Sequence, residues 1–402
     1  MKAIGLISGT SVDGIDAVIV DIPAAIEEKG GAVVDILGFA TYPYPEGVRE
    51  RLLKISAPGG GCVEEICHLN AYVGELFARA AIRIAKETAI ALHEIDVIGS
   101  HGQTIHHLPH PRNEEGINVT STLQIGEPSI IAERTGVTTV ADFRPRDMAA
   151  GGEGAPFAPY AHYFLFRHPA KSRIILNIGG ISNVTYLPAG ASPDDVIAFD
   201  TGPGNMVLDQ LVVRFTDGAK QYDNDGQWAA RGACCQPLLE WMFTHPYLQR
   251  RPPKSTGREE FGAPFITRVY EQGRTLEISD ADMLATATMF TVETIVKSCY
   301  SFLPLNVEST EPVEMIVCGG GVKNDTLMAL LRQHCAPISV CPVEHVGGSS
   351  DALEAITFAL LARAMILGKP SNLPAATGAT APVLLGKIVP GHQYAGVRVK
   401  EG

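Results

Sequence analysis

The chain has 402 residues, of which 46% are apolar and 19% are charged, and its formal net charge is −12. This length and apolar content are sufficient for two domains with separate cores. The acidic balance argues against binding along a nucleic-acid backbone. No apolar run reaches about 18 residues, so we expect no membrane span, and residues 1–22 do not have the flanks or cleavage site of a signal peptide.

The cysteines are scattered and form neither a CxxC pair nor a Cys/His array with zinc spacing. We therefore expect reduced thiols and a cytoplasmic protein rather than a disulfide framework. The eight residues are Cys62, Cys67, Cys234, Cys235, Cys299, Cys318, Cys335 and Cys341.

Two apolar runs at 3–7 and 17–20 predict the strands of a hairpin. The turn between them, Ser8 to Asp16, is rich in glycine and hydroxyl residues, and the amides of such a turn can converge on an anion. Its two carboxylates, Asp13 and Asp16, suit a divalent cation that accompanies a phosphate. The turn is predicted to be a nucleotide–Mg²⁺ clamp, and an ordinary hairpin with a polar tip is the alternative.

Strands and helices alternate through the rest of the first half, which indicates an α/β architecture. Its longest helix has apolar residues at spacings of three and four. The predicted strands are 33–41, 96–100, 121–125 and 137–141, and the predicted helices are 46–57, 63–93 and 128–135.

A second round begins near Ser172 with another glycine-rich hairpin. Polar clusters follow the predicted strands repeatedly, at the sheet edge where ligands bind in open α/β folds. The predicted strands of this half are 173–178, 184–187, 196–199, 315–318, 339–342 and 383–388. Helices are expected at 205–215, through most of 221–300 outside a loop at 250–262, after the glycine triplet up to 334, and at 350–368.

The two halves resemble each other, since each opens with a strand, a glycine-rich turn and a returning strand. We therefore predict two α/β domains, 1–145 with 369–402 and 146–368, on either side of a nucleotide and sugar cleft. In this arrangement the two hairpins would grip one phosphate tail. Closure around the substrates is expected, because water other than the nucleophile must be excluded.

Eight motifs follow one another along nearly the whole chain. They are SGTSVDGID (8–16), GSHGQT (99–104), QIGEP (124–128), ADFRPRDMAAGGEGAP (141–156), NIGGISN (177–183), FDTGPGN (199–205), PKSTGRE (253–259) and VCGGG (317–321). With them the sequence resembles the anhydro-N-acetylmuramic acid kinases, in the superfamily of actin, sugar kinases and heat-shock chaperone ATPases. The resemblance implies two actin-like, ribonuclease H-like domains. Levoglucosan kinases share the same motifs.

The resemblance implies an ATP-dependent reaction in peptidoglycan recycling and amino-sugar catabolism. Water opens the 1,6-anhydro ring of 1,6-anhydro-N-acetylmuramic acid at C1, and the γ-phosphoryl group moves to O6. The product is N-acetylmuramic acid 6-phosphate. A levoglucosan-type kinase is the near alternative, and a non-catalytic nucleotide switch of the actin or chaperone kind is the alternative from another class. ATP with Mg²⁺ and the anhydro-sugar are the expected partners, without nucleic acid or membrane.

Phosphoryl transfer requires charge neutralisation and alignment, and the glycine motifs supply candidates for both. The first clamp would be Gly9, Thr10, Ser11, Val12, Gly14 and Ile15, with Asp13 and Asp16 positioning Mg²⁺. The second clamp would be Gly179, Gly180 and Asn183, and the resemblance implies that Gly319, Gly320 and Gly321 receive the adenosine.

Ring opening requires a carboxylate that deprotonates the attacking water. Asp200, which ends a strand before Gly202, is the first choice, and the family has its base at the matching aspartate. The alternatives are that Asp200 caps the following helix or that Asp147 is the base. Glu354 is implied to act near the sugar or the water.

The remaining sugar-side candidates come from the strand end at 100–104 and the loop at 141–156. They are His101, Gln103, Arg146 and Asp147, the last two by resemblance. Lys254, Ser255 and Arg258 fit either a nucleotide contact or a homodimer contact. Glu153 and the segment 344–353 depart from the usual family pattern, which leaves the identity of the sugar open rather than the reaction type.

Overall fold

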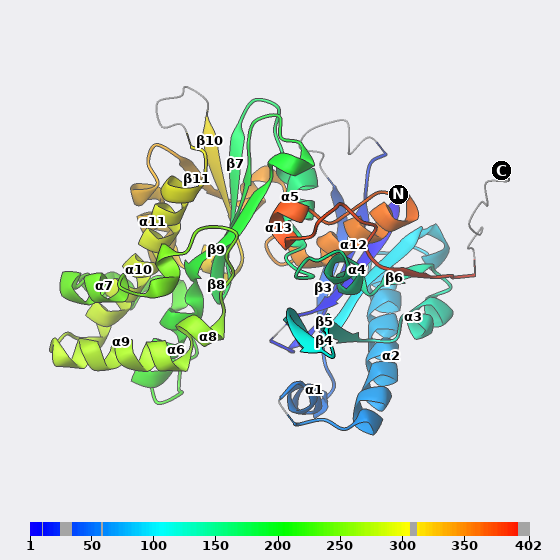
Figure 1. The fold of residues 1–402 in the computed structure, drawn as a ribbon, viewed down its shortest axis with the longest axis horizontal. Helices are drawn as coiled ribbons and strands as arrows, with labels where there is room; N and C mark the ends of the chain where they lie inside the picture. The colour runs from blue at the N-terminus through cyan, green and yellow to red at the C-terminus, as the bar shows by residue number, and fades with distance from the viewer. Residues whose placement is uncertain (10, 25–33, 58, 306–311, 393–402) are drawn as a thin grey trace. The chain divides into compact units, whose positions relative to one another are not determined.

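The computed structural model describes residues 1–9, 11–24, 34–57, 59–305 and 312–392. The chain divides into two compact units, one of Met1–Leu165 with Ala352–Gly402 and one of Phe166–Asp351 (Figure 1). Each unit has its own mixed sheet with helices packed on it, so the predicted α/β architecture is confirmed. No helix in the described part of the chain is long and apolar enough to cross a membrane.

The boundaries between the units differ from the predicted ones, because residues 146–165 and helix α12 (Leu353–Ile366) belong to the first unit. Helix α12 packs on strands β1 and β4 of the first sheet. Two glycines allow this approach: a Cβ on Gly5 would overlap the carbonyl oxygen of Ala355, and one on Gly99 would overlap that of Phe358. Because α12 is apolar on nearly every face, its sequence does not indicate which sheet it covers.

The first unit is built on a seven-stranded sheet of order β12-β6-β4-β1-β2-β3, with β5 paired to β4. Strand β1 runs antiparallel to β2 and parallel to β4, so the first hairpin is joined to a parallel core. Its strands are β1 (Lys2–Ser8), β2 (Gly14–Asp21), β3 (Asp35–Pro43), β4 (Val97–Glu114), β5 (Ile117–Ile125), β6 (Thr139–Ala141) and β12 (Lys387–Val389).

The helices of this unit cover both faces of the sheet's core. The face of α2 at spacings of three and four is buried, as the sequence predicted, with Leu69, Val73 and Phe77 fully enclosed. The helices are α1 (Val48–Ser56), α2 (Val63–Glu87), α3 (Pro128–Thr135), α4 (Phe143–Ala149), α5 (Ala158–Phe166), α12 and α13 (Pro374–Thr377), with the 3-10 turn η1 (Leu92–Glu94).

Several predicted element ends were wrong, and the largest differences are in the first unit. Strand β4 continues past residue 100 to Glu114 and forms a long antiparallel arm with β5, with register shifts at 104–106 and 108–112. Pro109 and Pro111 interrupt the alternation there, and a strand signal is lost where proline removes a ladder donor. Helix α2 ends at Glu87, and the last strand is 387–389 rather than 383–388.

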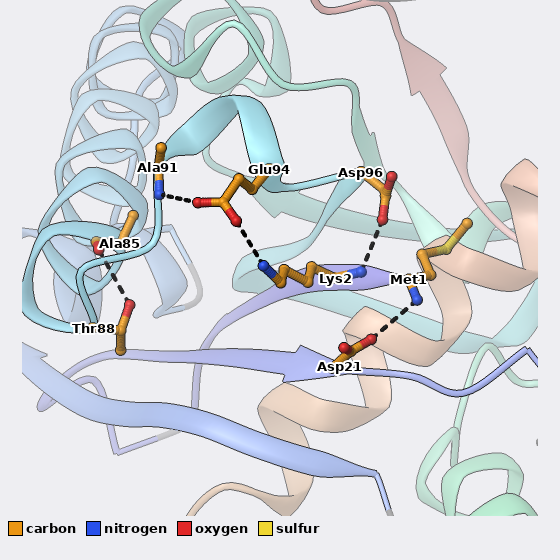
Figure 2. A network of polar contacts seen from close by, with 8 residues as sticks. All are labelled: Met1, Lys2, Asp21, Ala85, Thr88, Ala91, Glu94 and Asp96. Atoms are coloured by element: carbon orange, nitrogen blue, oxygen red, sulfur yellow. Dashed lines mark hydrogen bonds and ion pairs between the residues drawn. The ribbon is translucent and has the colours of Figure 1, made fainter.

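Polar contacts fix the start of β1, at the opposite end of the strand from the glycine-rich turn (Figure 2). The terminal ammonium of Met1 donates to Asp21 at 3.1 Å. The backbone amide of Lys2 donates to Asp96 at 2.8 Å, and its ammonium group lies 2.8 Å from Glu94. These contacts set the register of β1 against β2 and β4, and therefore where the turn after Ser8 lies.

The second unit has a five-stranded sheet of order β11-β10-β7-β8-β9. The antiparallel hairpin β7–β8 again lies beside a parallel strand, β10, so the predicted similarity of the two halves is seen in their topology. The strands are β7 (Ser172–Ile178), β8 (Ile181–Leu187), β9 (Ile197–Pro203), β10 (Val313–Cys318) and β11 (Ser339–Pro342).

Helices of the second unit enclose one core against this sheet, with Phe261, Phe265 and Phe290 among its buried side chains. The last two residues of the glycine triplet open a 3-10 turn, and α11 starts only after that turn ends. The helices are α6 (Asn205–Phe215), α7 (Gln236–Met242), α8 (Arg258–Phe261), α9 (Ala263–Thr275), α10 (Asp280–Phe302) and α11 (Asp325–His334), with 3-10 turns η2 (Pro193–Asp195), η3 (Asn224–Gly226), η4 (Ala229–Arg231), η5 (Pro246–Gln249), η6 (Gly320–Lys323) and η7 (Val343–Val346).

Candidate functional site

The turn between β1 and β2 is compact and conformationally strained. Val12 has a φ of 54°, which a β-branched residue rarely adopts, and its amide donates to the carbonyl of Gly9 at 3.2 Å. Its side chain and that of Ile15 are buried in the core of the first unit, so only their backbone groups are available to a ligand. Ser11 and Asp13 are exposed, whereas Thr10 lies outside the described residues.

A group of buried polar atoms lies under this turn without hydrogen-bond partners among the described residues. The group includes Ser8 Oγ, Ser100 Oγ, Gln103 Oε1 and the hydroxyl of Tyr44. Gln103 donates its amide to the carbonyl of Gly9 at 3.4 Å, and Ser8 and Gln103 are register partners on β1 and β4. Buried polar groups normally find partners, so this edge of the sheet is suited to a polar ligand or ordered water.

Two carboxylates of the first unit influence each other beside the turn. Asp16 on β2 accepts a hydrogen bond from Thr41 Oγ1 at 2.6 Å. Glu354, in the first turn of α12, is exposed although protein atoms crowd around it, and its pKa is raised by desolvation and then by the Asp16 charge, against a lowering by Arg144. A cation would relieve the repulsion between these two carboxylates.

The residues present would suit Mg²⁺ only as an ion held mainly by phosphate and water. Within the described residues, no group of three His, Cys, Asp or Glu side chains is arranged to hold a metal ion. Mg²⁺ characteristically uses one or two protein carboxylates and keeps several waters or substrate phosphates. Asp16 is the better placed of the two predicted ligands, because it lies near a second carboxylate while Asp13 is at the exposed tip of the turn.

His101, which is buried, and Arg144, which is half-buried, form a hydrogen-bonded pair in the first unit. The guanidinium of Arg144 donates to His101 Nε2 from Nε at 3.2 Å and from Nη2 at 3.0 Å, and to the carbonyl of Gly154 at 2.9 Å. His101 Nδ1 then donates to the carbonyl of Gly102 at 3.0 Å. Desolvation and the Arg144 charge lower the pKa of His101 to about 3, so this ring is neutral and both of its nitrogens are engaged.

This geometry favours a supporting role for His101 and draws attention to Arg144. Desolvation lowers the pKa of Arg144 to about 10, and the nearby charge of Glu354 opposes that shift. The guanidinium remains cationic at neutral pH and lies beside the carboxylate pair. Arg146, the arginine that the sequence analysis assigned to the substrate, is exposed on α4. The sequence alone offered no way to separate the two, since both lie in the same motif.

Asp147 is fully buried and its carboxylate is surrounded by donors. Oδ2 accepts from the amide of Gly154, and Oδ1 accepts from Asn372 Nδ2 and Thr377 Oγ1, each at 2.8 Å. A Cβ on Gly152 would overlap Oδ2, which explains the glycine at that position. These contacts favour a role in shaping the loop at 150–154 over direct contact with substrate.

The turn of the second hairpin is joined to the start of α6. The carbonyls of Gly179 and Gly180 accept from the amides of Asn205 and Met206, at 2.8 and 3.1 Å. Gly180 is exposed, and Gly179 and Asn183 are half-buried. The turn is therefore held rigidly while part of its backbone remains accessible.

The glycine triplet lies against the end of β7 in the same unit. Gly319 has a φ of 83°, and a Cβ there would overlap Asn177 Oδ1. A Cβ on Gly321 would lie 2.5 Å from the side chain of Ile178, whose carbonyl also accepts from Asn205 Nδ2 at 3.2 Å. The ends of β7 and β10 and the start of α6 therefore meet at one edge of the second sheet.

Asp200 lies within β9, opposite Asn183 on β8, and the strand continues to Pro203 instead of ending before Asp200 as predicted. Its amide donates to the carbonyl of Lys254 at 3.1 Å, and its carbonyl accepts from the hydroxyl of Tyr247 at 2.8 Å. Its Oδ2 accepts from the amide of Thr256 at 2.8 Å. The alternative that Asp200 caps the next helix was wrong, because the N-cap of α6 is Gly204.

The sequence motifs do not predict that Tyr247 and Lys254 contact Asp200. Tyr247 lies outside every motif, and the motif at 253–259 predicts either a nucleotide contact or a dimer contact for Lys254. Tyr247 and Lys254 are about fifty residues from Asp200 in the sequence. A local sequence pattern cannot predict a contact between residues this far apart.

A model of the family described as anhydro-N-acetylmuramic acid kinase matches residues 1–391. The chain belongs to this kinase family. An anhydro-N-acetylmuramic acid kinase from Caldanaerobacter subterraneus is 45% identical over 386 residues, which cover 96% of each chain. One from Trichormus variabilis is 44% identical over 96% of each chain, and one from Bacillus cereus is 42% identical over 96% of this chain and 98% of the relative.

Solved structures outside this kinase family are more distant. A ROK-family glucokinase from Streptomyces griseus has a TM-score of 0.39 and 12% identity, over 90% of this chain and 99% of the glucokinase. An activator of a 2-hydroxyisocaproyl-CoA dehydratase from Clostridium difficile has a TM-score of 0.43 and 12% identity, over 90% and 94%. Likeness at this level carries no conclusion about the substrate.

Proposed function

We propose that this member of the family is an ATP-dependent kinase that opens the 1,6-anhydro ring of 1,6-anhydro-N-acetylmuramic acid with water and phosphorylates O6. The product is N-acetylmuramic acid 6-phosphate, an intermediate expected in peptidoglycan recycling. The observation that carries the proposal is the family match over residues 1–391, with relatives of this name above 40% identity along 96% of the chain. The arrangement around Asp200 supports the ring-opening half of the reaction.

In the proposed mechanism Asp200 is the general base. Its carboxylate takes a proton from the water that attacks C1, a C1–O bond forms, and the bond from C1 to O6 breaks. O6 then needs no proton, because it forms a bond to the γ-phosphorus as ADP departs. The Thr256 amide holds one oxygen of Asp200, which fixes the carboxylate plane while the base acts.

On the first unit, Glu354 and Arg144 are proposed to face the sugar or the attacking water. Desolvation and the Asp16 charge raise the pKa of Glu354, which makes its carboxylate a better proton acceptor than an ordinary glutamate. Arg144 offers a fixed positive charge whose direction is set by His101 and the carbonyl of Gly154. His101, Gln103 and Asp147 then support the site from beneath, and Arg146 remains an exposed candidate for the substrate.

ATP is proposed to use the two hairpin turns for its phosphates and the glycine triplet for its adenosine. In the first turn, the backbone amides near Gly9 and Gly14 and the side chain of Ser11 would bind the phosphates. In the second turn, Gly179, Gly180 and Asn183 would do so. Mg²⁺, held by Asp16 with Asp13 through water, would neutralise charge on the phosphates. A cytoplasmic location is part of the proposal, since all eight cysteines are free thiols.

The test is turnover of 1,6-anhydro-N-acetylmuramic acid, followed as ADP release and as product mass, with levoglucosan as the second substrate. Replacing Asp200→Asn keeps the shape and removes the base, so kcat should fall by about 10³-fold or more. Asp217→Asn, at an exposed aspartate of the same unit, is the matched control and should leave kcat unchanged.

Near-normal turnover by the Asp200→Asn protein would remove Asp200 from the role of base. Absence of turnover by the unmodified protein on both sugars, together with tight ATP binding, would refute the kinase proposal. A higher kcat/KM for levoglucosan than for 1,6-anhydro-N-acetylmuramic acid would show that the proposed substrate is wrong while the proposed reaction type is right.

A further inference from the structure

Lys254 has an unusual environment for a lysine. Its side chain is only 9% exposed, and its ammonium nitrogen makes no hydrogen bond with any described residue. Lys and Arg are almost never buried to this degree without a partner. The ammonium instead lies over aromatic rings, 4.8 Å from the centroid of Tyr247, 4.9 Å from that of Phe302 and 6.0 Å from that of Phe199.

The aromatic rings stabilise the Lys254 ammonium less than the water that it loses on burial. Cation–π contacts of this kind stabilise a desolvated ammonium by about 2 kcal/mol, less than the cost of burying a charge. Desolvation accordingly lowers the pKa of Lys254 to about 8, against an opposing effect of the Asp200 charge. A residue that costs stability in this way requires a compensating reason for being a lysine.

The same segment holds Asp200 from two sides. The Lys254 carbonyl accepts from the Asp200 amide, and the Thr256 amide donates to Asp200 Oδ2. Tyr247, which stacks against the ammonium, also donates its hydroxyl to the Asp200 carbonyl. The backbone of the Lys254 segment and the aromatic ring beside the Lys254 ammonium therefore both contact Asp200.

The other charged groups around this cluster largely balance one another. Arg250, at the end of η5, is paired with Glu260 of α8 at 2.6 Å, and His245 lies 3.7 Å from the same carboxylate. Glu259 of α8 acts on the Tyr247 hydroxyl more weakly than Asp200 does. The uncompensated charge of the cluster is thus the Lys254 ammonium, and Asp200 on β9 is the anion that it affects.

We propose that Lys254 is a positioning residue for Asp200: its side chain fixes the segment that orients the carboxylate, and its buried positive charge favours the ionised, base-competent form. The proposal rests on the proposed function, in which Asp200 deprotonates the attacking water. It replaces the earlier alternatives of a nucleotide or dimer contact for this lysine.

The test compares pH profiles of kcat for the unmodified protein and Lys254→Met, which keeps the apolar stem and removes the charge. The acidic limb of kcat reports the base in the enzyme–substrate complex. In Lys254→Met its midpoint should move up by about one pH unit, so kcat well below both midpoints should fall about tenfold. Lys254→Arg keeps the charge and should keep the midpoint, and KM for both substrates should change less than about twofold in either variant.

Lys297→Met is the matched control. Lys297 belongs to the same unit, lies 3.6 Å from the Phe243 ring centroid, and is paired with Glu293 on its own helix. Its replacement removes a charge and a cation–π contact without touching Asp200, and the acidic limb should stay in place. An acidic limb in Lys254→Met that overlays that of the unmodified protein would overturn the proposal.

A second readout separates this inference from the proposed function. Carboxyl-¹³C aspartate labelling gives the titration of Asp200 directly, with the signal assigned by its loss in Asp200→Asn. If the protein turns over neither sugar, the proposed function fails, but the Asp200 midpoint must still rise in Lys254→Met. Lys254→Gln serves as the second neutral variant, and loss of folding in both would also overturn the charge role, because neutral groups should replace an unpaired buried charge without loss of stability.

Discussion

Replacing Asp147 tests whether its carboxylate has a structural or a catalytic role in the first unit. Asp147→Asn preserves the shape of the side chain and removes its charge. In the structure, one carboxylate oxygen receives the fixed amide of Gly154, and the other receives Asn372 and Thr377. An asparagine has one acceptor oxygen and one NH₂ group. Its NH₂ group would therefore face either the Gly154 amide or the Asn372 amide, and both of these are hydrogen-bond donors.

The magnitude follows from the number of donors left without a partner. Each hydrogen bond to a charged group contributes about 1.5–3 kcal/mol, and a buried donor left unsatisfied costs about 1–3 kcal/mol. Because Asp147 is completely enclosed, water cannot replace the lost acceptor. We expect Asp147→Asn to cost about 3 kcal/mol. For a unit of this size that is a drop in Tm of about 6–12 °C, and Asp147→Ala should cost about 3–5 kcal/mol.

Differential scanning calorimetry with and without ATP measures the shift, and kcat is measured at a temperature at which every variant remains folded. Glu153→Gln is the control, because it removes a carboxylate from an exposed position of the same loop. We expect its Tm and kcat to match those of the unmodified protein. An Asp147→Asn protein that melts like the unmodified protein while kcat falls about 10³-fold would refute this reasoning and make Asp147 a catalytic base.

Two other consequences of burial can be measured on stability alone. His101 and His162 have pKa values lowered to about 3, mainly by desolvation, so the unfolded chain binds protons that the folded chain does not as pH falls below about 6.5. Between about pH 6 and 4, each histidine should lower the free energy of unfolding by about 1.4 kcal/mol per pH unit. His162→Gln should therefore reduce the slope of the unfolding free energy against pH, measured by urea denaturation, by about 1.4 kcal/mol per pH unit. An unchanged slope would contradict this expectation. Gly99→Ala would drive a Cβ into the carbonyl oxygen of Phe358 on α12, so we expect a loss of at least about 2 kcal/mol in urea unfolding, and a neutral effect would show that α12 shifts freely.

Local patterns predicted much of the fold because the signals were periodic or strongly punctuated. The two hairpins, helix α2 and strand β9 all combine an apolar run with a glycine-rich end, and each lies close to where it was expected. Asp200 was expected just after a strand that ends at Phe199, but β9 continues through Asp200 to Pro203, so the end of that strand was predicted too early. The arm formed by β4 and β5 was underestimated because its polar residues and two prolines remove the alternation on which a strand prediction depends.

The partners of the site residues could not be predicted in this way. Asp147 is joined to Asn372 and Thr377 across more than 200 residues of chain, and Asp200 to Tyr247 and Thr256 across about fifty. Similarly, the predicted boundaries included α12 in 146–368, whereas it packs on the first sheet through tertiary contacts such as those at Gly5 and Gly99. The chemistry-bearing residue types were recognisable, but their surroundings are tertiary.

Those surroundings separate three carboxylates that look alike in sequence. Asp147 has both oxygens engaged by donors and no exposure, so a proton transfer to it would break contacts that the fold depends on. Glu354 reaches solvent but is crowded by Asp16, which favours its protonated form. Asp200 is half-buried, has one oxygen held by the Thr256 amide, and interacts with the charge of Lys254. A base for ring opening needs an oriented carboxylate near a positive charge, and this is why the proposed mechanism gives that role to Asp200 rather than to Asp147 or Glu354.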